Sequence, residues 1–589
     1  MRFCLLALTL ATLHAQVPGE PEKAAQAVKI LDAWHAESPK KEERLLHFVL
    51  WTPKDREAPE KYQERLTRMM EHIQEFYAKE MKRLGFGPRS INLPYEEPGK
   101  LKIHLVKGQH PDAHYAVQSG AEIKKECLPV LREAGIDADK ETLVIFCNLA
   151  RWDAEKLVFT HKSPYYAGGN FRGGTAWQLD SPELDPQNLS LKEPMMKDGQ
   201  YGRISLGKHN SIFIGGVCHE LGHALGLPHC KQRPDEAARG TALMGSGNRT
   251  YGDELRDEGK GSFLTLAHAL RLASHPQLSG SIKGLNEPST AEINDLKITA
   301  KGKAIEVAGS VKANPPVYAV VAYFDPEGGG DYNATTATAI PDKNGNFTLS
   351  CDALPAGKNG ELRLHPLHVN GSSGGWMSQT KFKFPYAIEK DGTPDLSTYQ
   401  IKNSLTPLIA ALAKNDFATA RQIASGLEHP QAAKIAFSLL RQDTIQTPIN
   451  KFTRKAALTR LTPVKEKVGW GRPAYDRLPG PSPLLEAGSK IFATGIYAHA
   501  PSLHEYRLPG KWSTFEGSVG IAAGKTGSVR FEVKGDGKSL WKSPVLKAGQ
   551  LKSFSIDTKG VKSLQLLTDT TPDGAASDWG LWLEPTLKR

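Results

Sequence analysis

The chain has 589 residues, of which 39% are hydrophobic and 8% aromatic, and its formal net charge is +11. This length exceeds what one hydrophobic core supports and predicts three or four domains of ordinary globular composition. The 75 Lys and Arg residues form no basic run and no basic patch interleaved with aromatics, which argues against a nucleic-acid-binding protein.

Residues 1–15 have the features of a secretion signal. Arg2 supplies a positive start, an apolar stretch follows, and Ala15 offers a small residue before a cleavage site. No later stretch is apolar over the length needed to cross a bilayer. We therefore expect an exported protein, either secreted or periplasmic or at the cell surface, without a membrane span.

The region after the signal alternates between two periodicities. Helical periodicity covers 21–35, 58–84 and 122–134, and strand-like patterns cover 45–51, 101–106 and 142–147. This alternation predicts a partly parallel sheet backed by helices.

One short stretch, HELGHALGLPH, carries chemistry. His219 and His223 are four residues apart on a predicted helix, so both imidazoles can reach one metal ion. Glu220 projects beside that ion, where it can take a proton from a bound water. Gly226 accepts the positive φ that ends a helix, and the chain reversal brings His229 back as a third ligand. Three nitrogen ligands with an open fourth position are typical of a catalytic zinc ion.

This pattern resembles that of the metzincin zinc peptidases, HExxHxxGxxH followed by a turn that contains methionine. Met244 is well placed to be that methionine, whose thioether forms an apolar floor beneath the imidazoles. The resemblance implies an α/β (α+β) metzincin-like catalytic domain, which we expect to span residues 16–278. Two residues depart from the family pattern. Cys230 follows the third histidine, and Ser246 stands where some subfamilies carry a tyrosine that assists the transition state.

The resemblance also suggests where a substrate binds. In the family, the strand before the zinc helix is a sheet edge with which an extended substrate pairs. Gly173, Gly174 and Trp177 are the candidate substrate-binding residues, since glycines leave the backbone open to a substrate strand. The alternative is an ordinary surface loop. Residues 181–210 have the composition of an insertion beside the cleft.

Three further regions follow the zinc motif. A helix is predicted over 262–276, with Ser262 as its N-cap and Pro276 as its stop. Alternating segments predict a β-sandwich over 279–390, which we expect to act as a spacer or support because it shows no motif for chemistry. An alanine-rich helical stretch predicts a connector over 391–445.

The last region, residues 459–589, is strand-like. Its ordered segments GIYAHAPS, FEGSVGI, GSVRFEV and SDW resemble the NPCBM family. That family is a β-sandwich module found beside glycan-active enzymes, and the resemblance implies carbohydrate binding.

Two sets of residues in this module are candidate ligand contacts. Trp512, Trp541 and Trp579 can stack on sugar rings, or can fill the sandwich core instead. Asp573 and Asp578 are candidates for a calcium ion, because a loop rich in carboxylate oxygens suits that hard cation.

Five cysteines remain after the predicted signal. Bridges between Cys218 and Cys230 or between Cys127 and Cys147 are the candidates, with buried free thiols as the alternative. The odd count leaves at least one thiol free.

The pairing of a metzincin-like site with an NPCBM-like tail resembles bacterial peptidases that cut mucin-type O-glycoproteins. We therefore expect a secreted Zn²⁺-dependent endopeptidase that hydrolyses O-glycosylated, mucin-like proteins and binds glycans through its tail. One alternative is a general secreted metalloprotease that its tail localises on polysaccharide, and another is a glycan-binding adhesin with an inactive peptidase domain. The positive charge is either a solvated basic surface or a means of attracting acidic glycans.

Overall fold

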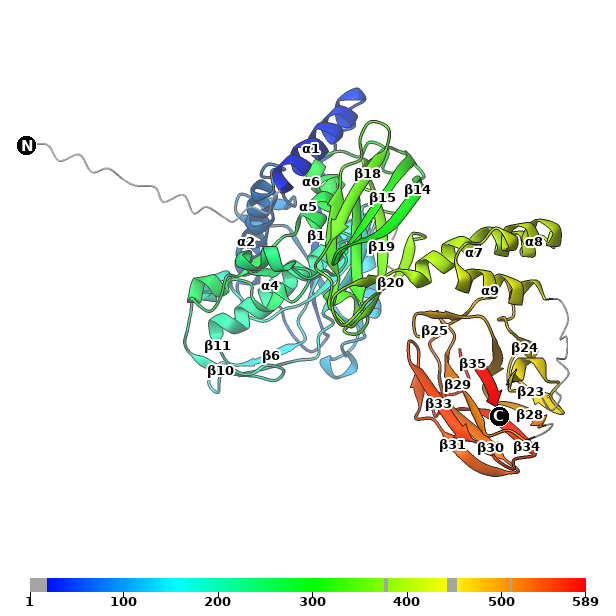
Figure 1. Ribbon diagram of the computed structural model, residues 1–589. Coiled ribbons are helices and arrows are strands. Elements are labelled where there is room, and N and C mark those ends of the chain that lie inside the picture. Colours follow the sequence, from blue (N-terminus) through cyan, green and yellow to red (C-terminus); the bar gives the residue numbers. More distant parts are fainter. Residues whose placement is uncertain (1–18, 375–379, 442–452, 509–510) are drawn as a thin grey trace, which may run out of the picture. The chain divides into compact units, whose positions relative to one another are not determined.

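The structure is a computed structural model that describes residues 19–374, 380–441, 453–508 and 511–589. It divides into two compact units, Met1–Phe384 with Ile388–Pro394, and Pro385–Ala387 with Asp395–Arg589 (Figure 1). The predicted signal at 1–15 lies outside the described residues. Within the described part of the chain, no helix is both long and apolar enough to cross a bilayer.

The first part of the first unit is a mixed sheet with helices. Its helices are α1 (Glu20–Glu37), α2 (Tyr62–Arg83), α3 (Gly120–Glu133), α4 (Leu206–Ala224), α5 (Leu266–Ala273) and α6 (Pro276–Ser279). The main sheet contains β1 (Leu46–Thr52), β4 (Ile103–Lys107), β5 (Thr142–Cys147), β8 (Tyr166–Asn170) and β9 (Gly173–Leu179). Its order is β4-β1-β5-β9-β8, and only β8 runs antiparallel to its neighbour. The predicted partly parallel sheet is therefore confirmed.

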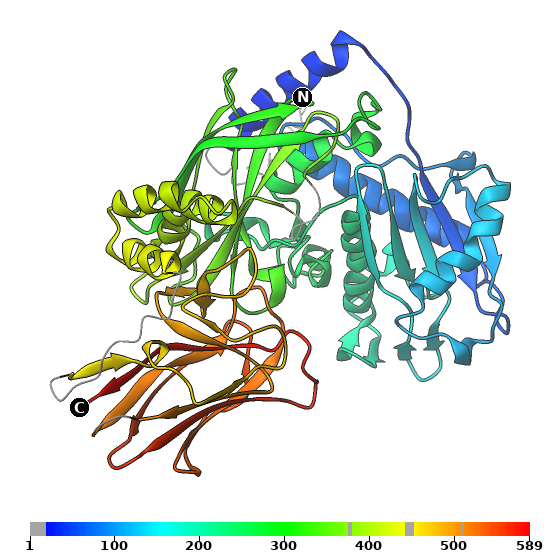
Figure 2. The ribbon, with the colours of Figure 1, turned by 90° about the vertical axis from the view of Figure 1, so that its right-hand side faces the viewer.

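Helices cover both faces of this sheet (Figure 2). Successive side chains of a strand point to opposite faces. Phe48 and Leu50 of β1 accordingly join the buried cluster that contains side chains of α2 and α4, whereas Val49 and Trp51 pack with α3. The sheet thus gives α4, the helix of the HELGH motif, a rigid support.

Short strands surround this core. They are β2 (Tyr95–Glu97), β3 (Lys100–Leu101), β6 (Ala150–Asp153), β7 (Val158–His161), β10 (Met195–Asp198), β11 (Gly202–Ser205), β12 (Thr241–Ala242) and β13 (Ser262–Phe263). The expected helix over 262–276 is wrong at both ends. Ser262 belongs to β13, Thr265 occupies the N-cap position of α5, and Pro276 begins α6.

The segment read as an insertion, 181–210, contributes β10, β11 and the first turn of α4. His209 anchors it, because the imidazole lies fully buried between two carboxylates. Its Nδ1 is 3.1 Å from Oδ2 of Asp198, and its Nε2 is 3.1 Å from Oε1 of Glu183. The segment is therefore fastened to α4 by a buried imidazole held between two carboxyl groups.

The predicted β-sandwich is also present in the first unit. Its strands are β14 (Thr290–Lys301), β15 (Ala304–Asn314), β16 (Val317–Pro326), β17 (Thr335–Ala339), β18 (Asn346–Cys351), β19 (Asn359–His368), β20 (Lys383–Ile388) and β21 (Pro394–Asp395). They form the sheets β14-β15-β18 and β17-β16-β19-β20-β21. Tyr318 and Val321 of β16 share one buried cluster with Leu270 of α5, so this sandwich packs directly on the helical layer.

In its described residues, 391–441, the helical connector predicted over 391–445 contains three helices. These are α7 (Ser397–Ala413), α8 (Phe417–Ser425) and α9 (Pro430–Leu440). The strands of the second unit are β22 (Lys455–Ala457), β23 (Lys465–Lys467), β24 (Ala474–Tyr475), β25 (Leu485–Ala487), β26 (Lys490–Phe492), β27 (Gly495–His499), β28 (Ser502–Arg507), β29 (Thr514–Ile521), β30 (Ser528–Gly535), β31 (Lys538–Lys542), β32 (Leu546–Lys547), β33 (Leu551–Asp557), β34 (Ser563–Thr570) and β35 (Trp579–Lys588). Two six-stranded antiparallel sheets make a C-terminal β-rich module.

Neither candidate disulfide is present. Cys127, Cys147, Cys218, Cys230 and Cys351 are all buried free thiols. They behave as small apolar side chains of the core, as the alternative interpretation had it.

Candidate metal centre

The helix α4, which carries the HELGH motif, is positioned by close packing along its length. The side chain of Ser205 caps it by accepting a hydrogen bond from the backbone of Lys208 at 3.0 Å. A Cβ atom at Gly222 would lie 2.6 Å from Sδ of Met244, so only glycine allows the methionine to sit under this turn. Met244 is fully buried, as expected for the floor of the site.

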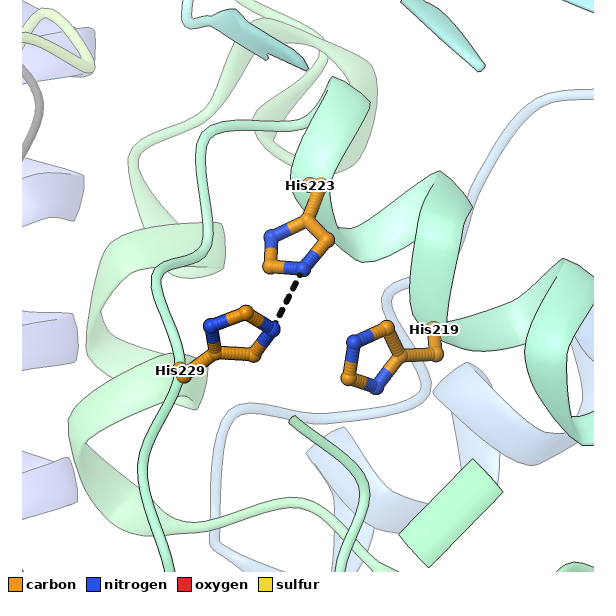
Figure 3. Close-up of side chains that lie close together, drawn as sticks. All are labelled: His219, His223 and His229. Atoms are coloured by element: carbon orange, nitrogen blue, oxygen red, sulfur yellow. Dashed lines mark hydrogen bonds between the residues drawn. The ribbon is translucent and has the colours of Figure 1, made fainter. Parts of the chain in front are cut away.

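The three predicted histidines converge (Figure 3). α4 ends at Ala224, and Gly226 adopts φ 82°, the left-handed conformation that reverses the chain toward His229. One ligand nitrogen of each ring lies within 4.8 Å of the other two. The Nε2 atoms of His223 and His229 are 3.0 Å apart.

Hydrogen bonds fix the orientation of each imidazole. His219 donates through Nδ1 to the carbonyl of Leu243 at 2.7 Å, and His223 donates likewise to the carbonyl of Leu227 at 2.7 Å. With Nδ1 protonated, Nε2 of each ring keeps its lone pair for a metal ion. The carbonyl beside the Met-turn residue therefore selects the tautomer of the first ligand.

Burial also sets the charge of the site. It lowers the pKa of His219 to about 3 and that of His223 to about 4, so both rings are neutral at physiological pH. Burial raises the pKa of Glu220 to about 8. Neutral imidazoles are a donor set that suits Zn²⁺, and the three histidines fit the ion that the motif implies.

A carboxylate that we did not expect completes the centre. Nδ1 of His229 donates to Oδ1 of Asp331 at 2.8 Å. Asp331 lies in a short 3₁₀ helix, η6 (Gly330–Asn333), in the loop between β16 and β17 of the sandwich. The sandwich, expected to be a spacer or support without chemistry, thus places a carboxylate against one of the predicted metal ligands. The one local signal is a run of three glycines just before this aspartate, and nothing in the sequence links it to a histidine 102 residues away.

The next residue of the same loop also reaches the centre. The ring of Tyr332 stacks on His229, with centroids 3.6 Å apart, although 48% of the tyrosine is exposed. Burial of its hydroxyl, followed by the charge of Glu220, raises the pKa of Tyr332. A neutral phenol thus lies near the glutamate, while Ser246 at the Met-turn offers no such group.

The candidate substrate residues are placed differently from the expectation. Gly173 and Gly174 lie in β9, which pairs with β5 on one side and β8 on the other, so their backbone is not open to a substrate strand. A Cβ atom at Gly174 would lie 2.2 Å from the carbonyl oxygen of Ala224, so this glycine is needed for packing against α4. Trp177 is partly buried and packs with the α3 cluster. The outer strands of this sheet are β4 and β8, and β8 is the one that lies beside α4.

The candidate sugar-binding tryptophans differ in exposure. Trp512 is only 2% exposed in the core of the module and is not available to a sugar. Trp541 packs against the same core. Trp579 is partly exposed, and the centre of its ring lies 5.2 Å from that of Trp470. Trp470 is 55% exposed and was not among the residues predicted from the sequence. Nζ of Lys525 lies 3.9 Å from the ring of Trp579.

The two calcium candidates are already engaged in hydrogen bonds. Oδ1 of Asp578 accepts the backbone N–H of Ser528 at 3.0 Å, and Asp573 accepts the hydroxyl of Ser528 at 2.8 Å. Among the described residues, no third acidic, histidine or cysteine side chain joins them in a metal-binding cluster. The calcium ion stays a prediction.

Comparison with known proteins supports the C-terminal module. Residues 454–588 match the NPCBM/NEW2 domain, as predicted. A putative endo-alpha-N-acetylgalactosaminidase from Renibacterium salmoninarum is 30% identical over 122 residues, which cover 19% of this chain and only 8% of that relative.

Two solved structures are similar over a longer stretch. Wild-type OgpA from Akkermansia muciniphila is 28% identical, covering 60% of this chain and 95% of that one, with a TM-score of 0.48. Catalytically inactive OgpA in complex with an O-glycopeptide substrate, glycodrosocin, is 27% identical over 60% and 94% of the two chains, with a TM-score of 0.48.

Proposed function

We propose that this chain is an exported, zinc-dependent endopeptidase of the metzincin type that hydrolyses O-glycosylated, mucin-like proteins. The observation that carries the proposal is the convergence of three imidazoles, two of them neutral by burial, around one point, with Glu220 following His219 in the same helix. The glycoprotein part of the proposal is supported by the NPCBM/NEW2 module in the same chain.

His219, His223 and His229 would hold the ion. A bound Zn²⁺ would act as a Lewis acid that acidifies water, polarises the scissile carbonyl and favours the ionised form of the adjacent glutamate. Asp331 keeps the ring of His229 oriented, as carboxylate partners of ligand histidines do.

The remaining steps belong to side chains near the histidines. Glu220 accepts a proton from the attacking water and later delivers one to the leaving amine. The hydroxyl of Tyr332 donates a hydrogen bond to the oxyanion that develops on the scissile carbonyl, the role that Ser246 cannot fill. The free edge of β8 can pair with an extended peptide next to this centre.

Mass spectrometry of a digested mucin-type glycoprotein tests the proposal. We expect cleavage next to glycosylated Ser or Thr, and loss of cleavage when the same substrate is first stripped of O-glycans. The Glu220→Gln protein, loaded with zinc, is the matched control for contaminating proteases. Equal cleavage of the stripped substrate, or rapid digestion of casein, would instead favour a general metalloprotease.

A further inference from the structure

A small cavity lies beside the chain reversal that follows the zinc helix. Its volume is about 120 Å³, and its walls come from the β8–β9 turn, the residues just after α4, the end of α5 and the loop after β19. Gly371 closes one wall in a left-handed conformation, φ 93°, where a Cβ atom would lie 2.9 Å from Cβ of Phe171. No acidic side chain lines the cavity.

Arg271 of α5 lines this cavity and is 7% exposed. Its Nε donates to the hydroxyl of Tyr323 at 2.9 Å, and its Nη1 donates to the carbonyl of Gly226 at 3.4 Å. Its Nη2 is buried and has no hydrogen-bond partner, and the described residues supply no carboxylate within ion-pair distance. A buried cation without a counter-charge costs several kcal/mol even after relaxation.

Two other deeply buried arginines of this unit form ion pairs with aspartates. Arg65 meets Asp180 at 2.7 Å, and Arg256 meets Asp253 at 2.6 Å. Both of these cations are compensated by side chains of the protein itself. Arg271 is buried almost as deeply, yet it lines a cavity and none of the lining residues is acidic.

The rest of the wall adds donors and positive charge. Arg172 lines the cavity from the β8–β9 turn, and Ser372 and Ser373 line it from the loop after β19. Hydroxyl groups and guanidinium groups are the donors that hold oxyanions in proteins. The wall therefore offers several donors to a negatively charged group.

We propose that this cavity binds a small oxyanion, a carboxylate or sulfate group, through the guanidinium of Arg271, whose Nη2 has no hydrogen-bond partner. Such a group would supply the counter-charge that the protein lacks at this position. The anion can come from the medium or from an acidic sugar on the substrate, and only the second source rests on the proposed function. Since Arg271 also donates to Gly226, the anion would be bound next to the turn that carries His229.

Sulfate titration of the full-length, zinc-loaded protein tests this site. Calorimetry with sodium sulfate, at an ionic strength held constant with chloride, should show one saturable site. Arg271→Met, which removes the charge and keeps much of the stem, should weaken binding by about tenfold or more. Lys297→Gln, which removes a charge from an exposed residue of β14, is the control for general charge effects and should bind sulfate normally.

Two further measurements complete the test. Crystals of the unsubstituted protein grown in selenate should show anomalous signal beside Arg271, which decides the matter if Arg271→Met does not fold. Zinc-loaded Glu220→Gln protein should bind a sialylated or sulfated glycopeptide more tightly than its neutral counterpart if the anion comes from substrate. Sulfate binding alone would assign the site to a free anion.

The proposal is overturned if neither sulfate nor the acidic glycopeptide depends on Arg271, or if selenate is found only elsewhere. If the protein bound sulfate through Arg271 but hydrolysed no glycoprotein, the proposed function would be refuted and the anion site would still be supported.

Discussion

Replacement of Asp331 examines whether the sandwich domain completes the metal centre. Asp331→Ala removes the acceptor of the His229 Nδ1 proton, and the ring then loses the group that fixes its tautomer and direction. Losing a carboxylate partner of a ligand histidine weakens metal binding by about 10- to 100-fold, or about 1.4 to 2.7 kcal/mol. The two side chains are only 15% and 28% exposed, so solvent screens this contact less than it screens a surface ion pair.

A graded pair of substitutions separates charge from geometry. Asp331→Asn keeps an oxygen that can accept the His229 proton, so it should lose less zinc affinity than Asp331→Ala. Competition with a chromophoric chelator measures that affinity without reference to activity. Glu327→Gln is the matched control, because this exposed carboxylate precedes the same loop and pairs only with Asn359.

Unchanged zinc affinity in Asp331→Ala would refute the reasoning, since the contact would then be incidental to the metal site. Equal losses in Asp331→Ala and Glu327→Gln would point to disorder of the loop instead of the loss of one hydrogen bond.

Four other predictions concern catalysis and stability. Glu220→Gln should keep zinc, measured by plasma mass spectrometry, and lose about 10²- to 10⁴-fold in kcat, because an amide cannot accept the proton. Tyr332→Phe keeps the stacked ring and removes the hydroxyl, so kcat should fall by about 10²-fold with zinc affinity unchanged. Gly174→Ala should lower the free energy of unfolding in urea by about 1 to 3 kcal/mol, because its Cβ would lie 2.2 Å from the carbonyl oxygen of Ala224. Burial lowers the pKa of His209, but hydrogen bonds and charges from its two carboxylate partners outweigh burial and raise it overall. Its contribution to stability is thus complete below the unfolded-state pKa of 6.5 and is lost as pH rises through the folded value, so His209→Gln should flatten that part of the stability curve.

Each of these has an outcome that would contradict it. Near-normal turnover by zinc-loaded Glu220→Gln would mean that another group is the base. Loss of zinc in Tyr332→Phe would make the hydroxyl part of the metal site. Gly168→Ala is the control for Gly174→Ala, because a Cβ there meets nothing within 4 Å, and equal destabilisation would exclude the packing argument. If the free energy of unfolding changed with pH equally in the wild-type and His209→Gln proteins, the buried imidazole would carry no charge.

Some predictions were confirmed because they depend only on residues that are close together in the sequence. The spacing of His219 and His223, together with Gly226, specifies a local geometry that a helix and its C-terminal turn produce in any setting. Strand and helix patterns likewise located β1, α2 and β5 to within a few residues. The C-terminal module was recognisable from short segments in a fixed order.

Other expectations failed because they depend on which elements become neighbours. Gly173 and Gly174 look like an open edge in sequence, but β8 folds back and pairs with them. Trp512 has an aromatic ring that could stack on a sugar, but it is buried in the core of the module. A glycine or tryptophan in a strand can therefore be either exposed or buried, and the elements that pack against the strand decide which.

By itself, the sequence predicted that His219, His223 and His229 converge and located much of the secondary structure, since each follows from spacings within one helix, turn or strand. The roles of these histidines as zinc ligands and of Glu220 as the base stay predictions. Only the tertiary structure decided that Asp331 and Tyr332 meet His229, and that Arg271 faces a cavity without a counter-charge. Those contacts join segments far apart in the chain, and they exist because the β-sandwich and the zinc-helix layer share one buried core.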